Sequence, residues 1–154
     1  SAVHTLTHQD LTKLDKDTVY NEVFLDKQNL ERMFDCQITG MAYPYGTYND
    51  EVVQILKKCK IQYARSVVSS GAFKLQKNLL IFKPTCHHAD ENIWELLEKF
   101  LKEKSEEKQL FYIWGHSYEF DVNNNWKRME EILDRLIGHN NIFYGTNREV
   151  LLPC

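Results

Sequence analysis

The first residues of this chain that could do chemistry are two histidines, His4 and His8, in the run HTLTH. Imidazoles four positions apart on one helical turn point the same way and can share one metal ion, as in the H-E-x-x-H motif. A catalytic zinc takes three protein ligands and keeps one position for water, whose pKa it lowers to about 7. The spacing alone also fits two exposed histidines on a frayed terminal turn, so other segments must decide between the two interpretations.

Three further groups of polar, glycine or proline residues follow predicted strands, and they are Tyr43–Gly46, Cys86–His88 and Gly115–Glu119. In parallel α/β folds, functional side chains gather at the carboxyl ends of the strands. Within these groups His116 suits general acid catalysis, because the pKa of histidine lies near neutrality. Neighbouring side chains of an extended backbone point to opposite faces. We therefore expect one of His87 and His88 to face a site and the other to be structural.

The elements that must position these residues alternate along the chain. Helical spacing of apolar residues predicts helices, and short apolar runs predict strands. The predicted helices cover 21–34, 50–60, 91–103 and 125–137, with Asn49 as the cap of the second, and the predicted strands cover 36–43, 61–68, 78–82, 109–114 and 141–144. This alternation is typical of a parallel α/β arrangement.

Composition excludes several classes of protein. The chain has 154 residues, the size of one domain, and a formal net charge of −3 with acids and bases interspersed. It lacks the basic stripe that phosphate backbones require, so we expect no nucleic-acid partner. No apolar run approaches the roughly 20 residues of a membrane helix. The four cysteines form no C-x-x-C pair, which disfavours a zinc ribbon. Localisation stays open, since a cytoplasmic and a secreted or cell-surface protein both fit.

In order and spacing, three segments resemble the polysaccharide deacetylases of carbohydrate esterase family 4, which share the NodB-like homology domain. The segments are HTLTH at His4–His8, AYPYG at Ala42–Gly46 and WGHSYEF at Trp114–Phe120. The resemblance runs from His4 to about Asn147. It implies an α/β fold, a partial or distorted (β/α) barrel with parallel strands, as a single deacetylase-like domain over residues 1–154. It also implies that His4 and His8 hold a divalent metal, with zinc as the expected ion.

The resemblance assigns further roles. The backbone N–H of Tyr45 would hold the oxyanion of the tetrahedral intermediate, and His116 would protonate the leaving amine. The family often has an arginine where Ala42 stands, and we expect Arg65, at the end of the next strand, to supply that positive charge. The residues expected to line the substrate site are Tyr43, Pro44, Gly46, His88, Tyr118, Glu119 and Trp126.

One departure from the family pattern is serious. The family's first motif, a T-F-D-D type segment, supplies the general base and a third metal ligand, but this sequence contains no Asp-Asp pair. Three explanations compete. The chain is a fragment that lacks its N-terminal strands, which we favour; a second copy completes the barrel in a homo-oligomer; or a short family member binds sugar or metal without turnover. Asp10 is a further candidate ligand, although the resemblance does not support it.

The predicted function is metal-dependent hydrolysis that removes acetyl groups from N-acetylated sugars of a polysaccharide or oligosaccharide. Because the aspartate motif is missing, this chain is expected to be inactive as a hydrolase on its own. The alternative is a non-catalytic carbohydrate-binding module on a degenerate barrel, with a sugar platform of aromatic side chains at Tyr43, Tyr45, Tyr118 and Trp126. The sequence leaves open which sugar polymer is bound and whether its acetyl group sits on nitrogen or oxygen.

Overall fold

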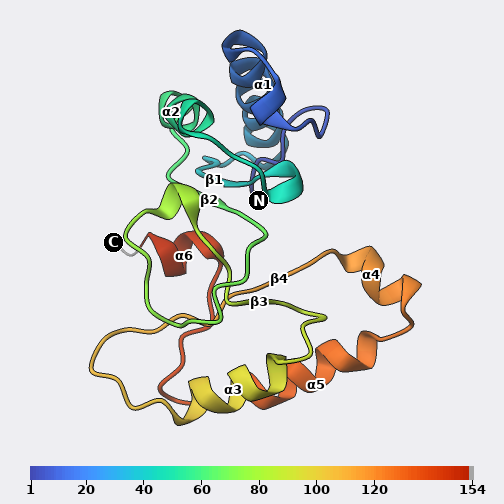
Figure 1. The fold of residues 1–154 in the computed structure, drawn as a ribbon, viewed down its shortest axis with the longest axis vertical. Helices are drawn as coiled ribbons and strands as arrows, with labels where there is room; N and C mark the ends of the chain where they lie inside the picture. Colours follow the sequence, from blue (N-terminus) through green and yellow to red (C-terminus); the bar gives the residue numbers. More distant parts are fainter. Residues whose placement is uncertain (153–154) are drawn as a thin grey trace. The chain divides into compact units, whose positions relative to one another are not determined.

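The computed structural model describes residues 1–152, in which helices alternate with short parallel strands (Figure 1). The predicted α/β class with parallel strands is therefore confirmed. The chain divides into two compact units, each with its own core. The first unit contains residues 1–67, 76–83 and the described residues from 145 on, and the second contains 68–75 and 84–144. The single domain predicted over residues 1–154 stays a prediction.

The first unit is built on parallel pairing between β1 (Gly40–Ala42) and β2 (Tyr63–Arg65), with Ala42 opposite Arg65. Isolated parallel bridges add Val3 beside β1 and Phe82 beside β2. Because parallel strands share one direction, the residues that follow Val3, β1 and β2 leave the strands at the same edge. His4, Tyr43 and the segment after Arg65 therefore begin from one edge of this unit.

Helices α1 (Lys16–Phe34) and α2 (Asp50–Lys58) pack together on the first unit, which also contains α6 (Asn147–Leu151) and the 3₁₀ turns η1 (Leu11–Lys13), η2 (Pro44–Gly46) and η3 (Leu79–Ile81). Helix α1 begins before its predicted start, because the Asp15 side chain accepts hydrogen bonds from the N–H groups of Asp17 and Thr18. Asn49 caps α2 as predicted, by accepting from the Val52 N–H. No helix within residues 1–152 combines the length and apolar character needed to cross a membrane.

The second unit pairs β3 (Cys86–His87) with β4 (Ile113–Trp114) in parallel, so that His87 lies opposite Trp114. Its helices are α3 (Ile93–Lys102), α4 (Ser117–Val122) and α5 (Trp126–Leu136), of which α3 and α5 lie side by side (Figure 1). The prediction of helices over 91–103 and 125–137 is confirmed, with slightly shorter bounds. Their apolar faces close a small core of Cys86, Ile93, Leu97 and Ile132.

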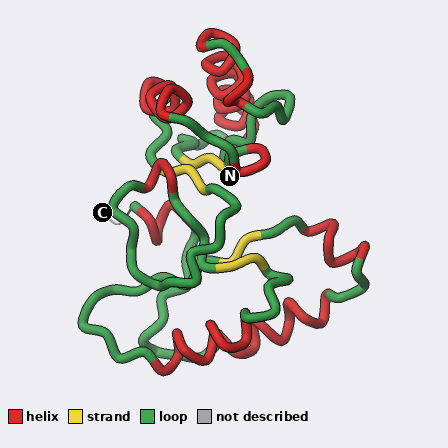
Figure 2. The backbone as a smooth tube through the Cα atoms, in the orientation of Figure 1, coloured by secondary structure: helices red, strands yellow, loops and turns green. Residues whose placement is uncertain are grey.

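Two predicted strands are wrong, and the others are shorter than predicted (Figure 2). Within 78–82 the chain forms the turn η3, because the Asn78 side chain accepts from the Leu80 N–H, and only Phe82 reaches a parallel bridge. Residues 141–144 form no strand. Phe143 and Tyr144 are 70% and 53% exposed there, so no sheet buries this apolar run.

Candidate functional site

The predicted metal pair His4 and His8 lies on a bent loop instead of a helical turn. Val3 is paired with β1, because its N–H donates to the Gly40 carbonyl and its own carbonyl accepts from the Ala42 N–H. His4 follows at once, and His8 has a left-handed φ of 58°. The helical geometry predicted for the pair is therefore wrong. Their rings nevertheless meet edge to face, with centroids 4.7 Å apart.

Helix α1 holds this loop in place from one side. The carboxylate of Glu22, which is 8% exposed, accepts from the N–H and the hydroxyl of Thr7 at 2.9 and 2.7 Å. One helical turn further, the Asp26 carboxylate accepts from the His4 N–H at 2.9 Å. Two acids of one helix face thus fix the backbone that carries the histidines.

The His4 ring is oriented by a backbone carbonyl. Its Nδ1 lies 2.7 Å from the Ala42 oxygen, and since a carbonyl can only accept, Nδ1 carries the proton and Nε2 carries the lone pair. Histidines that bind metals typically donate their second N–H to a carbonyl or carboxylate in this way. The His4 and His8 rings therefore fit a divalent metal as two nitrogen ligands.

The Pro44–Gly46 segment forms the turn η2 beside this pair, and the His8 and Tyr45 ring centroids lie 4.9 Å apart. Tyr45 has φ 57° and ψ 2°, a left-handed conformation that costs a residue with a Cβ about 1–2 kcal/mol. At Gly46, with φ 72°, an added Cβ would come within 2.8 Å of the Val67 backbone nitrogen. As the second residue of a helical turn, Tyr45 contributes one of the N–H groups that have no partner within the turn.

Other predicted residues of this unit differ in accessibility. Tyr43 is 1% exposed, and its hydroxyl donates to the Leu80 carbonyl at 2.7 Å, which makes the ring part of the core. Burial raises the pKa of Tyr43 well above its usual range. Pro44 is buried as well. The exposed sugar platform predicted at Tyr43 is therefore wrong, while Arg65 lies opposite Ala42 in the register of β1 and β2.

Asp10 was considered as a metal ligand, but its carboxylate forms hydrogen bonds within the first unit. Its carboxylate accepts from the N–H and hydroxyl of Thr12 and from the Thr47 hydroxyl, at 2.7 to 3.1 Å, and it pairs with the Lys13 ammonium. These hydrogen bonds hold the pKa of Asp10 far below its usual value. The side chain therefore joins η1 to the segment that follows η2.

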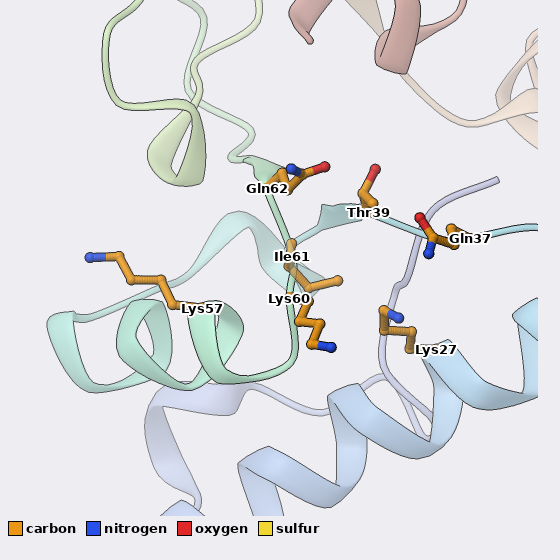
Figure 3. Close-up of a pocket in the computed structure, with 7 residues that line it drawn as sticks. All are labelled: Lys27, Gln37, Thr39, Lys57, Lys60, Ile61 and Gln62. Carbon is orange, nitrogen blue, oxygen red and sulfur yellow. The ribbon is translucent and has the colours of Figure 1, made fainter.

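A hollow of about 450 Å³ in the first unit is lined by Lys27, Gln37, Thr39, Lys57, Lys60, Ile61 and Gln62 (Figure 3). Figure 3 shows that the Lys57 side chain points away from Lys27 and Lys60. Lys27 is also paired with the Glu31 carboxylate. The three ammonium groups do not converge, and none of the predicted site residues lines this hollow.

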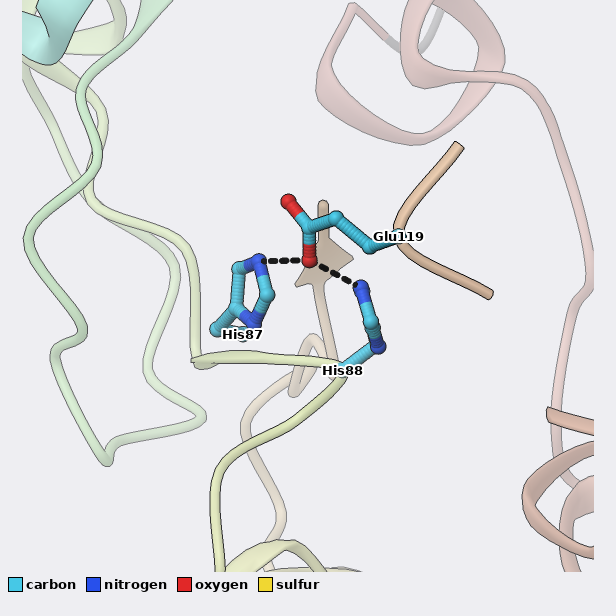
Figure 4. A group of neighbouring side chains, drawn as sticks. All are labelled: His87, His88 and Glu119. Atoms are coloured by element: carbon cyan, nitrogen blue, oxygen red, sulfur yellow. Dashed lines mark hydrogen bonds and ion pairs between the residues drawn. The ribbon is translucent and has the colours of Figure 1, made fainter. Parts of the chain in front are cut away.

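In the second unit, histidines surround the carboxylate of Glu119. Its Oε2 lies 2.6 Å from His88 Nε2 and 3.1 Å from His87 Nε2 (Figure 4). Its Oε1 lies 2.6 Å from His116 Nδ1. The expectation that His87 and His88 face opposite ways is wrong, because β3 ends at His87 and the chain turns at His88. Both rings therefore face the same oxygen.

The environment lowers the pKa of both His87 and Glu119, for different reasons. Desolvation lowers the pKa of His87, although the Glu119 carboxylate partly offsets it. For Glu119, desolvation opposes ionisation, but hydrogen bonds from His116 and His88 outweigh it and hold its pKa below the usual value. The combination favours a neutral His87 imidazole beside an ionised carboxylate.

The backbone around this cluster is closely fitted. An added Cβ at Gly115 would come within 2.0 Å of the His88 ring, so only glycine allows the approach of β4. Arg128 donates to the carbonyls of His88 and Asp90 at 3.0 and 2.8 Å, which fixes the turn after β3. His88 itself is 2% exposed and packs against Phe120. Nothing in the sequence pattern predicts these supports, since they join segments far apart in the chain.

The remaining predicted residues lie at the surface of the second unit. Tyr118 is 61% exposed and stacks on the His116 ring at 5.2 Å, and Trp126 is 49% exposed with its indole N–H donating to Asp121. His4, His8, Tyr45 and Arg65 belong to the first unit, whereas His88, His116, Tyr118, Glu119 and Trp126 belong to the second.

Solved structures of carbohydrate esterases share this fold. A family 4 carbohydrate esterase from Streptomyces lividans, in complex with acetate, has a TM-score of 0.50 and 14% identity over 86% of this chain and 59% of its own. A polysaccharide deacetylase from Bacillus cereus is 30% identical over 53% of this chain and 26% of its own, with a TM-score of 0.47. A family 4 pseudoenzyme from Bacillus anthracis is 14% identical over 87% and 41%, with a TM-score of 0.49. The chain has the predicted fold, a partial, distorted barrel of this type.

The model of the polysaccharide deacetylase family matches residues 1–64, which contain both HTLTH and AYPYG. No curated protein matches the chain. The predicted resemblance is thereby confirmed, and over residues 1–64 the chain is similar to the polysaccharide deacetylases. It spans 26% of the Bacillus cereus structure and 59% of the Streptomyces lividans structure.

Proposed function

We propose that this chain contributes to metal-dependent hydrolysis of acetyl groups from N-acetylated sugars. The observation that carries the proposal is the His4 ring, whose Nδ1–H donates to the Ala42 carbonyl and whose Nε2 lone pair is thereby presented beside His8. Relationship to the polysaccharide deacetylases supports the hydrolytic class. A zinc ion held by His4 and His8 would supply Lewis acidity and a water of lowered pKa.

The proposal gives each side chain a task. The Tyr45 N–H, set by the strained turn η2, donates to the oxyanion of the tetrahedral intermediate. Arg65 lies opposite Ala42 in the register, and it supplies the positive charge of the arginine that the family often has in place of Ala42. His116 protonates the leaving amine, while Glu119 holds its Nδ1–H and so fixes the tautomer. A second copy of the chain is the proposed source of the general base and the third metal ligand.

A zinc titration by calorimetry tests the metal site. We expect the parent chain to bind zinc, and we expect His4→Ala and His8→Ala each to lose one zinc per chain, because each removes one of the two imidazoles. His139→Ala is the matched control, since this half-buried histidine lies outside both clusters. Unchanged zinc stoichiometry in the His4 and His8 variants contradicts the assignment.

Acetate release from N-acetylated chito-oligosaccharides tests the reaction and its dependence on a second copy. We expect release at protein concentrations where the chain associates, measured by light scattering, and loss of release in His4→Ala. A chain that associates, binds zinc and still releases no acetate would refute turnover by the homo-oligomer.

The second candidate is a carbohydrate-binding module without turnover, favoured by the exposed aromatic rings of Tyr45, Tyr118 and Trp126 and by the lack of an Asp-Asp pair. Aromatic rings bind sugars through their apolar faces. Chito-oligosaccharide binding that persists in a His4→Ala/His8→Ala variant and falls in Trp126→Ala would favour this module over the hydrolase.

A further inference from the structure

We propose that His87, His88 and Glu119 form a second metal site, within the second unit and separate from His4 and His8. The geometry carries the proposal, because two imidazole nitrogens and a carboxylate oxygen, each from a different side chain, lie within 4.8 Å of one another. Figure 4 shows the two rings flanking the carboxylate from either side. The proposal does not rest on the deacetylase function.

The three donor atoms already lie close to the spacing that a metal requires. Tetrahedral zinc with bonds of about 2.0–2.1 Å separates its ligand atoms by about 3.3 Å. The observed distances from Glu119 Oε2 are 2.6 Å to His88 and 3.1 Å to His87. Shifts of less than about 1 Å would open the space, and two histidines with one glutamate are a known catalytic zinc set.

The surrounding structure holds the donors before any metal binds. His87 is fixed by the register of β3 against Trp114, and its ring contacts the Trp114 ring at 4.6 Å. His88 is nearly fully buried against Phe120, and Arg128 holds its carbonyl. Glu119 lies in the first turn of α4. Side chains from β3, from the turn after it and from α4 therefore converge on one point, so binding needs little further ordering of the ligands.

The chemistry of the cluster also suits a cation. A metal needs neutral imidazoles and an ionised carboxylate, because a proton on a ligand atom competes with the ion. The cluster offers these ligand types, two imidazole nitrogens and one carboxylate oxygen, at one point. His116 binds the other Glu119 oxygen, so the fourth position at the metal is left to water. Borderline ions such as zinc prefer this mixture of nitrogen and oxygen ligands.

The test uses the full chain with His4→Ala/His8→Ala, so that only the second site can bind. Zinc titration by calorimetry should still show one zinc per chain. Adding Glu119→Gln should weaken that affinity at least about 100-fold, since even residues that only support metal ligands contribute about 10- to 100-fold. Glu130→Gln, an exposed acid on α5, is the matched control and should leave the affinity unchanged.

A second variant guards against loss of folding. His87→Asn removes one ligand from a side chain that is 24% exposed, so the core packing stays intact, and circular dichroism checks the helices. We expect the same loss of zinc affinity in this variant. Zinc affinity unaffected by both Glu119→Gln and His87→Asn, or no zinc bound by the His4→Ala/His8→Ala chain, would overturn the second site while leaving the His4 and His8 proposal to its own test.

Discussion

At the scale of single residues, hydrogen-bond partners decide what the histidines can do. The spacing of His4 and His8 predicted a shared metal through helical geometry, yet the structure brings the rings together through a bent loop. The carbonyl that orients His4 comes from Ala42, on a strand 38 positions away. Spacing could identify the pair, but not the tautomer, because the orienting group is brought near only by strand pairing.

Gly115 offers a prediction at this scale that removes no ligand. Gly115→Ala places a Cβ within 2.0 Å of the His88 ring, which must then move away from Glu119. In the His4→Ala/His8→Ala chain, we expect zinc affinity to fall about 10-fold or more, as for other losses of ligand support. Calorimetry measures the affinity, and Gly138→Ala, where no atom lies within 4 Å, controls for loss of glycine itself. Equal affinity in both variants would contradict the close fit.

At the scale of elements, helices were easier to predict than strands. Helices α2, α3 and α5 carry an apolar stripe that can be identified within one segment, and their ends fall close to the predicted ones. The strands span only two or three residues, and their length depends on partners elsewhere in the chain. The runs 78–82 and 141–144 are apolar enough for strands. However, the first contains the 3₁₀ turn η3, and the second forms no strand.

The cap of α2 gives a prediction about stability. Asn49→Ala removes the side chain that accepts from the Val52 N–H, and we expect the free energy of unfolding to fall by about 1 kcal/mol. Urea denaturation followed by circular dichroism measures the change. Gln54→Ala, an exposed position of the same helix, should change it by less than about 0.5 kcal/mol. If the Asn49 cap contributed nothing, the two variants would have the same free energy of unfolding.

The junction between α1 and β1 gives a prediction about pH. The Glu31 carboxylate binds the Lys27 ammonium and accepts from the Ile38 N–H, and these contacts lower the pKa of Glu31. A lowered pKa stabilises the fold above the unfolded-state pKa, and this stability is lost as the pH falls through the folded-state value. We expect Glu31→Gln to lose about 1 kcal/mol at pH 7 and much less at about pH 3.

Urea midpoints of the parent chain and of Glu31→Gln at the two pH values measure this difference. Glu106→Gln, at an exposed position, is the control and should follow the parent at both. If Glu31→Gln lost the same stability at both pH values, the charge of Glu31 would have no part in the contact.

At the scale of the whole molecule, the match to the family model ends close to residue 67, where the first segment of the first unit ends. The residues matched by the family model, 1–64, fall inside the first unit, whereas WGHSYEF lies in the second. Sequence reasoning could predict the fold class from the alternation of elements, but not this division. The division depends on which apolar residues share a core, and that is decided by contacts between distant segments.

The two cores predict that destabilisation stays local. Leu56 in the first core and Leu97 in the second are 0% and 1% exposed, so Leu→Ala at either should cost about 2–5 kcal/mol in its own unit. Because local opening follows the contacts of each cooperative segment, we expect Leu56→Ala to speed amide hydrogen exchange in α1 and α2, and Leu97→Ala to speed it in α3 and α5. Leu133→Ala, at a position that is 52% exposed, should change neither. Hydrogen exchange followed by mass spectrometry on all three variants decides the matter, since faster exchange in every helix from either core substitution would show one cooperative core in place of two.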